Sequence, residues 1–261
     1  MLDVLLNTLI QIGIFVGAVF GVGFIISLIN RFFYHLAGTS KAVVYGTGFI
    51  GTPIHELSHA FFCVVFFHHI EEIKLFQISD EDGTLGYVSH SYNRRNIYQI
   101  IGNFFIGTAP ILVGTTLLML MLFLITPSTF GSITSALSPS MTYADIFPTL
   151  GKVIKAFFSG VSDWKWWLYL LFVILVAIHM NLSTADLKGT LISLPFIIII
   201  LFIVNFAIYF INKDAYQVFN KAMITGETYL ILILAMSLFF SLLTLGVGAI
   251  IYLVRRVTGR V

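Results

Sequence analysis

The sequence predicts an all-α polytopic membrane protein. Of its 261 residues, 58% are apolar and 10% are charged, and the mean hydropathy is +0.98. That leaves too little polar side chain to cover a soluble surface of this size. Apolar runs recur along the chain, and a helix needs about 20 apolar residues to cross a bilayer. We therefore expect a single membrane-embedded domain over residues 1–261. The net charge of +2 does not favour nucleic acid as a partner.

Six apolar stretches qualify, or nearly qualify, as membrane-spanning helices. They are Leu9–Asn30, Ala42–Phe67, Ile97–Ile125, Trp164–Met180, Leu187–Phe210 and Tyr229–Val254. The fourth stretch is shorter than a full crossing, so its junction with the fifth should dip into the membrane. Irregular backbone is tolerated at that depth only beside protein or a water-filled cavity. The sequence thus predicts a cavity near this junction.

Two segments outside these stretches have patterns of their own. Residues 72–90 alternate as a β-hairpin, with strands over 73–78 and 85–90 joined across 80–83. A two-stranded hairpin is marginal alone, so we expect it to rest on the helices or the membrane. Residues 143–159 have apolar side chains at helical spacing and two lysines elsewhere on the helix, which suits an interfacial helix or an ordinary loop helix.

An HExxH motif, His55-Glu56-Leu57-Ser58-His59, lies inside the second stretch. Residues four apart share a face of a helix, so His55 and His59 can bind one Zn²⁺ while Glu56 activates a water molecule. Ionisable residues at this depth are costly and usually functional. A pair of hydrogen-bonded histidines inside a helix bundle is the alternative.

A catalytic zinc site needs a third protein ligand and an open position for water. Asp186 and His179 are the candidates inside the membrane, and His179 should lie at the depth of the HExxH histidines on neighbouring helices. Asp186 also fits a second role, because Ser183-Thr184-Ala185-Asp186 is a capping box that would start a helix. Asn103 and Asn181 are accessory candidates that could hold a substrate carbonyl, or could serve as interhelical hydrogen-bond groups.

These motifs resemble those of the site-2 protease family of intramembrane zinc metalloproteases. The resemblance rests on HExxH in a membrane helix, a following hairpin, and a later Asn181…Asp186…Gly189 element that opens a membrane helix. In this element the Asn-to-Asp spacing is shorter than is common in the family, and the family's proline is absent. The resemblance implies an enzyme, a zinc metalloendopeptidase, with Glu56 as the general base and His55, His59 and Asp186 as the Zn²⁺ ligands. It also implies membrane-protein or membrane-associated peptide substrates, and regulation through a membrane partner or the substrate.

Two other functions remain open from the sequence. A membrane protease of the prenyl-processing or heat-shock type would take a glutamate as third ligand, and Glu227 is the late candidate. A non-catalytic metal-binding or transport protein could keep the histidines without cleaving peptides. The 14 lysines and arginines divide evenly between the two sides of a six-span arrangement, so their number does not set its orientation. Clustered arginines at helix ends and the family resemblance favour a cell-membrane protein with both termini cytoplasmic.

Overall fold

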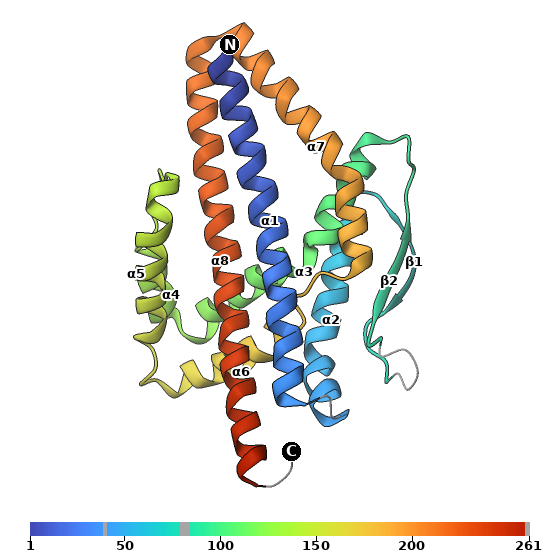
Figure 1. Cartoon of the computed structure of the whole chain (residues 1–261), viewed down its shortest axis with the longest axis vertical. Helices are drawn as coiled ribbons and strands as arrows, with labels where there is room; N and C mark the ends of the chain where they lie inside the picture. Colours follow the sequence, from blue (N-terminus) through green and yellow to red (C-terminus); the bar gives the residue numbers. More distant parts are fainter. Residues whose placement is uncertain (39–40, 79–83, 259–261) are drawn as a thin grey trace.

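The computed structural model describes residues 1–38, 41–78 and 84–258 as a bundle of helices with one two-stranded sheet at its side (Figure 1). In chain order the elements are α1 (Leu2–Ala37), α2 (Lys41–Val65), β1 (His69–Lys74), β2 (Tyr87–Ser91), α3 (Ile97–Ile125), α4 (Pro127–Thr134), the 3₁₀ turn η1 (Tyr143–Asp145), α5 (Ile146–Phe158), α6 (Trp164–Ala177), α7 (Thr184–Ile211) and α8 (Lys213–Val257). The all-α class with a small hairpin is confirmed.

The helices α3, α6, α7 and α8 begin where a polar side chain accepts one of the first free backbone N–H groups. Asn96 accepts from Tyr98 N at the start of α3, and Asp163 accepts from Lys165 N at the start of α6. Ser183 and Asn212 cap α7 and α8 in the same way. Each cap satisfies donors that would otherwise be unpaired, which is why the helices start at these residues.

Within the described part of the chain, four helices are long and apolar enough to cross a membrane: α1, α3, α7 and α8. The prediction of six spans is therefore only partly met. The α6 helix has 14 residues, about 21 Å at 1.5 Å per residue, which is shorter than a bilayer core. The α2 helix has 25 residues, but it contains the polar HExxH face and is not one of the four.

Large apolar side chains cover the outside of the bundle. Phe24 of α1, Ile203 and Phe210 of α7, and Val257 of α8 are 64%, 61%, 70% and 87% exposed. Such a surface is costly in water and suits lipid tails. The chain is accordingly a membrane protein.

The predicted break between the fourth and fifth apolar stretches is present. The α6 helix ends at Ala177 and α7 begins at Thr184, three residues before the predicted Leu187, with no regular structure between Met180 and Ser183. The depth argument also holds, because the His179 carbonyl lies 2.6 Å from His55 Nδ1. The junction of α6 and α7 thus meets the middle of α2.

The helices α1 and α8 pack along each other, as do α3 and α7, and α2 packs against α3. Figure 1 shows α1 and α8 running in the same direction, with the two chain ends at opposite ends of the long axis. Where the two termini lie relative to a membrane stays a prediction.

The hairpin pairs antiparallel, with Ile73 opposite Val88, Lys74 opposite Tyr87, and an irregularity between Ile70 and Glu72. Its first strand begins at His69, four residues earlier than predicted, and the regular ladder ends at Lys74. The predicted turn over residues 80–83 lies outside the described residues. The strands lie against α2, which gives this marginal hairpin the support it was expected to need.

The segment between α3 and α6 folds back on the bundle. The short helix α4, which was not predicted, and α5 pack on each other, and α5 also contacts α8. Thr149, Val153 and Phe157 form the buried face of α5, while Lys152 and Lys155 are exposed. The predicted helix over 143–159 is thus present, whereas its place at a membrane interface and the single-domain interpretation of residues 1–261 stay predictions.

Candidate metal centre

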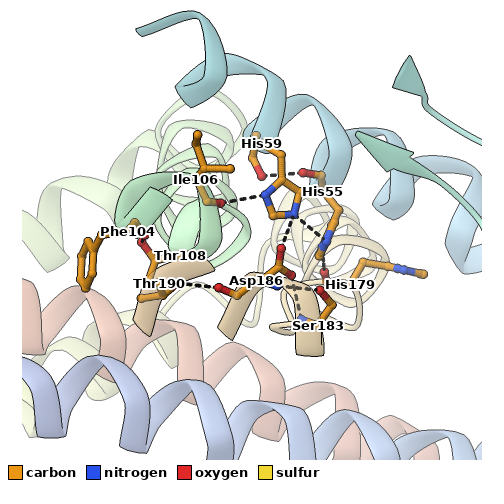
Figure 2. A network of polar contacts seen from close by, with 10 residues as sticks. His55, His59, Phe104, Ile106, Thr108, His179, Ser183, Asp186 and Thr190 are labelled. Atoms are coloured by element: carbon orange, nitrogen blue, oxygen red, sulfur yellow. Dashed lines mark hydrogen bonds and ion pairs between the residues drawn. The ribbon is translucent and has the colours of Figure 1, made fainter. Parts of the chain in front are cut away.

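The HExxH motif places two imidazoles on one face of α2. The Nε2 atoms of His55 and His59 lie 3.1 Å apart. Figure 2 shows both rings turned toward Asp186, which comes from the start of α7. One possible ligand atom from each of these three side chains lies within 4.8 Å of the other two.

Each imidazole is held by a backbone carbonyl from another segment. His55 Nδ1 lies 2.6 Å from the His179 oxygen, and His59 Nδ1 lies 2.8 Å from the Ile106 oxygen. A carbonyl only accepts, so each Nδ1 holds the proton of the neutral ring. Both Nε2 atoms are therefore unprotonated, and two lone pairs face each other without a proton between them. That arrangement is unfavourable by itself and favourable around a cation.

Asp186 divides its two carboxylate oxygens between two roles. Its Oδ2 accepts from Ser183 N at 2.7 Å, and its N–H donates to Ser183 Oγ at 3.1 Å, which completes the capping box. Its Oδ1 lies 3.5 Å from His59 Nε2. The sequence presented the cap and the ligand as alternatives, whereas the structure lets one side chain do both.

Two of the three separations between the donor atoms match those of a tetrahedral zinc site, and the third lies within 4.8 Å. Two ligands about 2.0–2.1 Å from one Zn²⁺ at a tetrahedral angle lie about 3.3 Å from each other. The separations of 3.1 Å between the His55 and His59 nitrogens and 3.5 Å between His59 and Asp186 bracket that value. Imidazole nitrogens and a carboxylate oxygen are also the ligand types of catalytic zinc sites.

Glu56 lies at the wall of a cavity of about 780 Å³ that also receives His55, His59 and Asp186. Its side chain is 6% exposed, and the hairpin backbone passes directly beside it. A Cβ at Gly86 would lie 3.0 Å from Glu56 Cγ and 2.8 Å from both Thr52 Cγ2 and the Lys74 oxygen. Gly86 thus allows the hairpin to close against the acid that the motif provides.

Gly51 allows an equally close approach on the other side of α2. A Cβ at this position would lie 2.4 Å from the Leu175 oxygen and 2.2 Å from His179 Cδ2. Pro53 lies inside α2 without interrupting it. The contact with α6 follows from the glycine, because its missing side chain admits the end of that helix.

The accessory candidates also line the cavity. His179 contributes its carbonyl to His55, while its own Nε2 lies 3.3 Å from Thr47 Oγ1. Asn103 is buried and its Nδ2 donates to the Ile100 oxygen at 3.3 Å, whereas Asn181 is exposed. His179 therefore positions a candidate ligand, and the catalytic roles of the two asparagines stay predictions.

Glu227 lies elsewhere in the bundle. Its carboxylate accepts a hydrogen bond from the Tyr143 hydroxyl, and it is not part of the group formed by His55, His59 and Asp186. The geometry therefore favours Asp186 over Glu227 as a third ligand. Cys63 is fully buried and does not line the cavity.

The residues of and beside the hairpin that line the cavity were not named as site residues from the sequence: Thr84, Leu85, Gly86, Tyr87, Val88, His90 and Tyr92. Because this run contains consecutive residues, the period-two pattern of a strand could not have selected it. The sequence could not indicate which face of the hairpin meets α2.

Comparisons of the chain with protein-family models, curated proteins and solved structures find no match. The geometry of this metal centre is therefore the basis for a functional assignment.

Proposed function

We propose that the chain is an intramembrane zinc metalloprotease that hydrolyses peptide bonds of membrane-protein substrates, as its resemblance to the site-2 proteases implies. One observation supports this most. The bare Nε2 atoms of His55 and His59 converge with a carboxylate oxygen of Asp186, in a cavity that also receives the buried Glu56. A cation site beside a carboxylate is the minimum needed to hydrolyse a peptide bond.

Each site residue has a role that follows from its chemistry. His55, His59 and Asp186 would hold Zn²⁺, which polarises the scissile carbonyl and lowers the pKa of a bound water toward 7. Glu56 takes a proton from the attacking water and gives it to the leaving nitrogen, so the C–N bond breaks with release of a carboxylate and an amine. The His179 and Ile106 carbonyls keep both imidazoles in the required tautomer.

The hairpin is the expected binding surface for the substrate. A helical membrane segment hides its peptide bonds and must unwind before cleavage, and its freed backbone groups then need partners. Residues 84–88, which lead into and begin β2, line the cavity. A strand edge here would pair with an unwound segment by strand addition. Recognition would then depend on ease of unwinding more than on side-chain sequence.

We infer that the two termini lie on opposite sides of the membrane, because α1 and α8 run in the same direction (Figure 1). The sole cysteine, Cys63, is fully buried, so single cysteines introduced at Leu2 and Val257 can be labelled selectively. An impermeant thiol reagent should label one of them from each side. Labelling of both from the same side would restore the original expectation.

The proposed activity is tested by Glu56→Gln in purified protein in detergent, with a single-span membrane peptide as substrate. The amide nearly matches the carboxylate in shape but cannot take a proton from water, so cleavage should stop while zinc content stays unchanged. Glu72→Gln, an exposed hairpin position, is the matched control and should cleave normally.

Other outcomes point to the other functions. Zinc retained in an inactive wild-type protein, with no effect of Glu56→Gln in cells, would favour a metal-binding or transport protein. Loss of zinc on Glu227→Gln would favour the prenyl-processing type of membrane protease.

A further inference from the structure

A second pair of histidines lies at the base of the hairpin, where α2 ends. His68 is buried, and its N–H donates to the Cys63 oxygen at 2.8 Å, which closes the last turn of α2. The preceding Phe67 has φ 56°, a left-handed conformation in which glycine is usual. Gln99 Nε2 holds the Phe67 carbonyl at 2.6 Å. His68 is thus fixed by the junction of α2 with α3.

The hydrogen bonds of this pair determine its protonation. His68 Nε2 lies 2.8 Å from the Gln99 carbonyl, which can only accept, so this nitrogen holds the proton. His68 Nδ1 therefore has a lone pair. It lies 3.1 Å from His90 Nδ1, which must donate. By elimination, the Nε2 of neutral His90 has a lone pair.

The environment keeps both rings neutral at neutral pH. Burial and the neighbouring His68 lower the pKa of His90, and burial lowers the pKa of His68. The charged or titratable groups whose electrostatic effect reaches His90 are His68, His59 of α2, Glu71 of β1 and Asp186 of α7.

His90 belongs to the wall of the metal-centre cavity. Gly86, four residues earlier, lies close to the Glu56 side chain. Among residues 1–38, 41–78 and 84–258, none makes a hydrogen bond to His90 Nε2. A residue of the wall that would meet a substrate thus has a basic nitrogen with a fixed tautomer.

We propose that His90 is a substrate-contacting residue, whose Nε2 accepts a hydrogen bond from a donor group of the polypeptide segment bound in the cavity. The donor would be a backbone N–H, a hydroxyl or an amide, and His68 is the positioning residue that turns the acceptor into the cavity. This inference rests on the proposed proteolytic function and specifies how its substrate is held.

The proposal predicts a specific pH dependence. Protonation of His90 places a proton on Nε2 and converts the acceptor to a donor, while Nδ1 continues to donate to His68. Because burial and His68 lower the pKa of His90, KM should rise as the pH falls below about 6.5, the ordinary pKa of histidine. The His90 ring stays in place when it is protonated. The pH dependence of kcat should therefore be the same in the wild type and in the control variant His69→Gln.

The kinetic test compares two substitutions on the single-span peptide. His90→Leu removes the acceptor and should raise KM about tenfold with kcat within about twofold, since one hydrogen bond is of that order. His90→Gln restores an acceptor that does not titrate, so its KM should stay near the wild-type value and lose the acid rise. His69→Gln, at an exposed position on β1, is the matched control. An unchanged KM in His90→Leu, or equal losses in both variants together with lost zinc, would overturn the proposal.

A binding measurement separates this proposal from the proposed activity. In ¹⁵N-histidine-labelled Glu56→Gln protein, which binds substrate without turnover, His90 Nε2 should give the signal of an unprotonated nitrogen. Adding the same peptide should shift that signal and leave His69 unchanged. If the shift occurs but wild-type protein does not cleave the peptide, the proteolytic function fails and the contact stands. No shift, or an Nε2 that is protonated at neutral pH, would refute the contact even in an active protease.

Discussion

Asp186 and Glu227 are two poorly exposed carboxylates in the same bundle, and the sequence offered both as zinc ligands. Asp186 uses one oxygen to cap α7 and directs the other toward His59 at 3.5 Å. Glu227 lies within α8 and accepts from the Tyr143 hydroxyl. The first carboxylate has an oxygen available for a metal beside two imidazole lone pairs, and the second is paired with a phenol.

The surroundings of Glu227 show what that carboxylate does instead. Two neighbours on α8 bind the same loop, since Tyr229 donates to the Ser138 oxygen and Thr225 donates to the Met141 oxygen. Glu227 is thus one of three contacts that fasten the segment before α5 to α8. Burial alone does not distinguish a metal-binding carboxylate from one that accepts a structural hydrogen bond. The groups that face the carboxylate distinguish them.

The largest effect should come from removing the ligand oxygen. Asp186→Ala should lose zinc and all cleavage, because two imidazoles alone hold the ion weakly. Glu227→Gln should keep its zinc content. Metal analysis of both purified variants checks this directly. Zinc retained in Asp186→Ala and lost in Glu227→Gln would reverse the comparison.

Asp186→Asn controls for the loss of the helix cap in Asp186→Ala. Its amide oxygen can still accept from Ser183 N, so α7 should start normally and the protein should fold. The NH₂ group that then faces His59 cannot bind a metal. Zinc binding should therefore fall even though thermal stability is preserved.

A smaller effect is expected from Gly51→Ala, which acts on the metal centre indirectly, through the end of α6. The added Cβ would overlap the Leu175 oxygen and the His179 ring, so the end of α6 must move and take with it the carbonyl that orients His55. Zinc affinity should fall by about 10–100-fold, the usual effect of losing an outer hydrogen-bond partner. In Gly46→Ala on the same helix the Cβ meets nothing within 4 Å, so zinc titrations of this control should match the wild type.

The smallest effect should come from the Glu227 cluster. Tyr143→Phe removes the donor to a buried carboxyl group and should lower the free energy of unfolding by about 1–3 kcal/mol. Zinc content and cleavage should not change. Thermal unfolding in detergent measures the loss, and Tyr252→Phe provides a control because this hydroxyl makes no side-chain hydrogen bond among the described residues. Lost zinc in Tyr143→Phe would place Glu227 in the metal centre after all.

Much of the fold could be predicted because its signals are local. Apolar runs located the long helices, and the capping box at Ser183, one of the two roles considered for Asp186, marks the observed start of α7. The HExxH spacing put His55 and His59 on one face, and counting residues from the helix starts brought His179 to their level. Each of these inferences needs only the period of a helix and its rise per residue.

The parts that were missed depend on contacts between distant segments. The sequence could not show that Asp186 serves as cap and metal-facing group at once, because this depends on how the carboxylate rotates between Ser183 and His59. Six crossings were predicted from apolar runs alone, whereas α6 has only 14 residues and ends at the loop that leads to α7. The approach of Gly86 to Glu56 also joins residues that no local pattern connects.

The central claim is that His55, His59 and Asp186 bind one zinc ion, and anomalous diffraction tests it most directly. Crystals of gently extracted protein would be measured on both sides of the zinc absorption edge, so that the difference map locates zinc alone. We predict one peak about 2.0–2.2 Å from His55 Nε2, His59 Nε2 and Asp186 Oδ1. A peak beside Glu227, or no peak between His55 and His59 in zinc-supplemented crystals, would contradict the account.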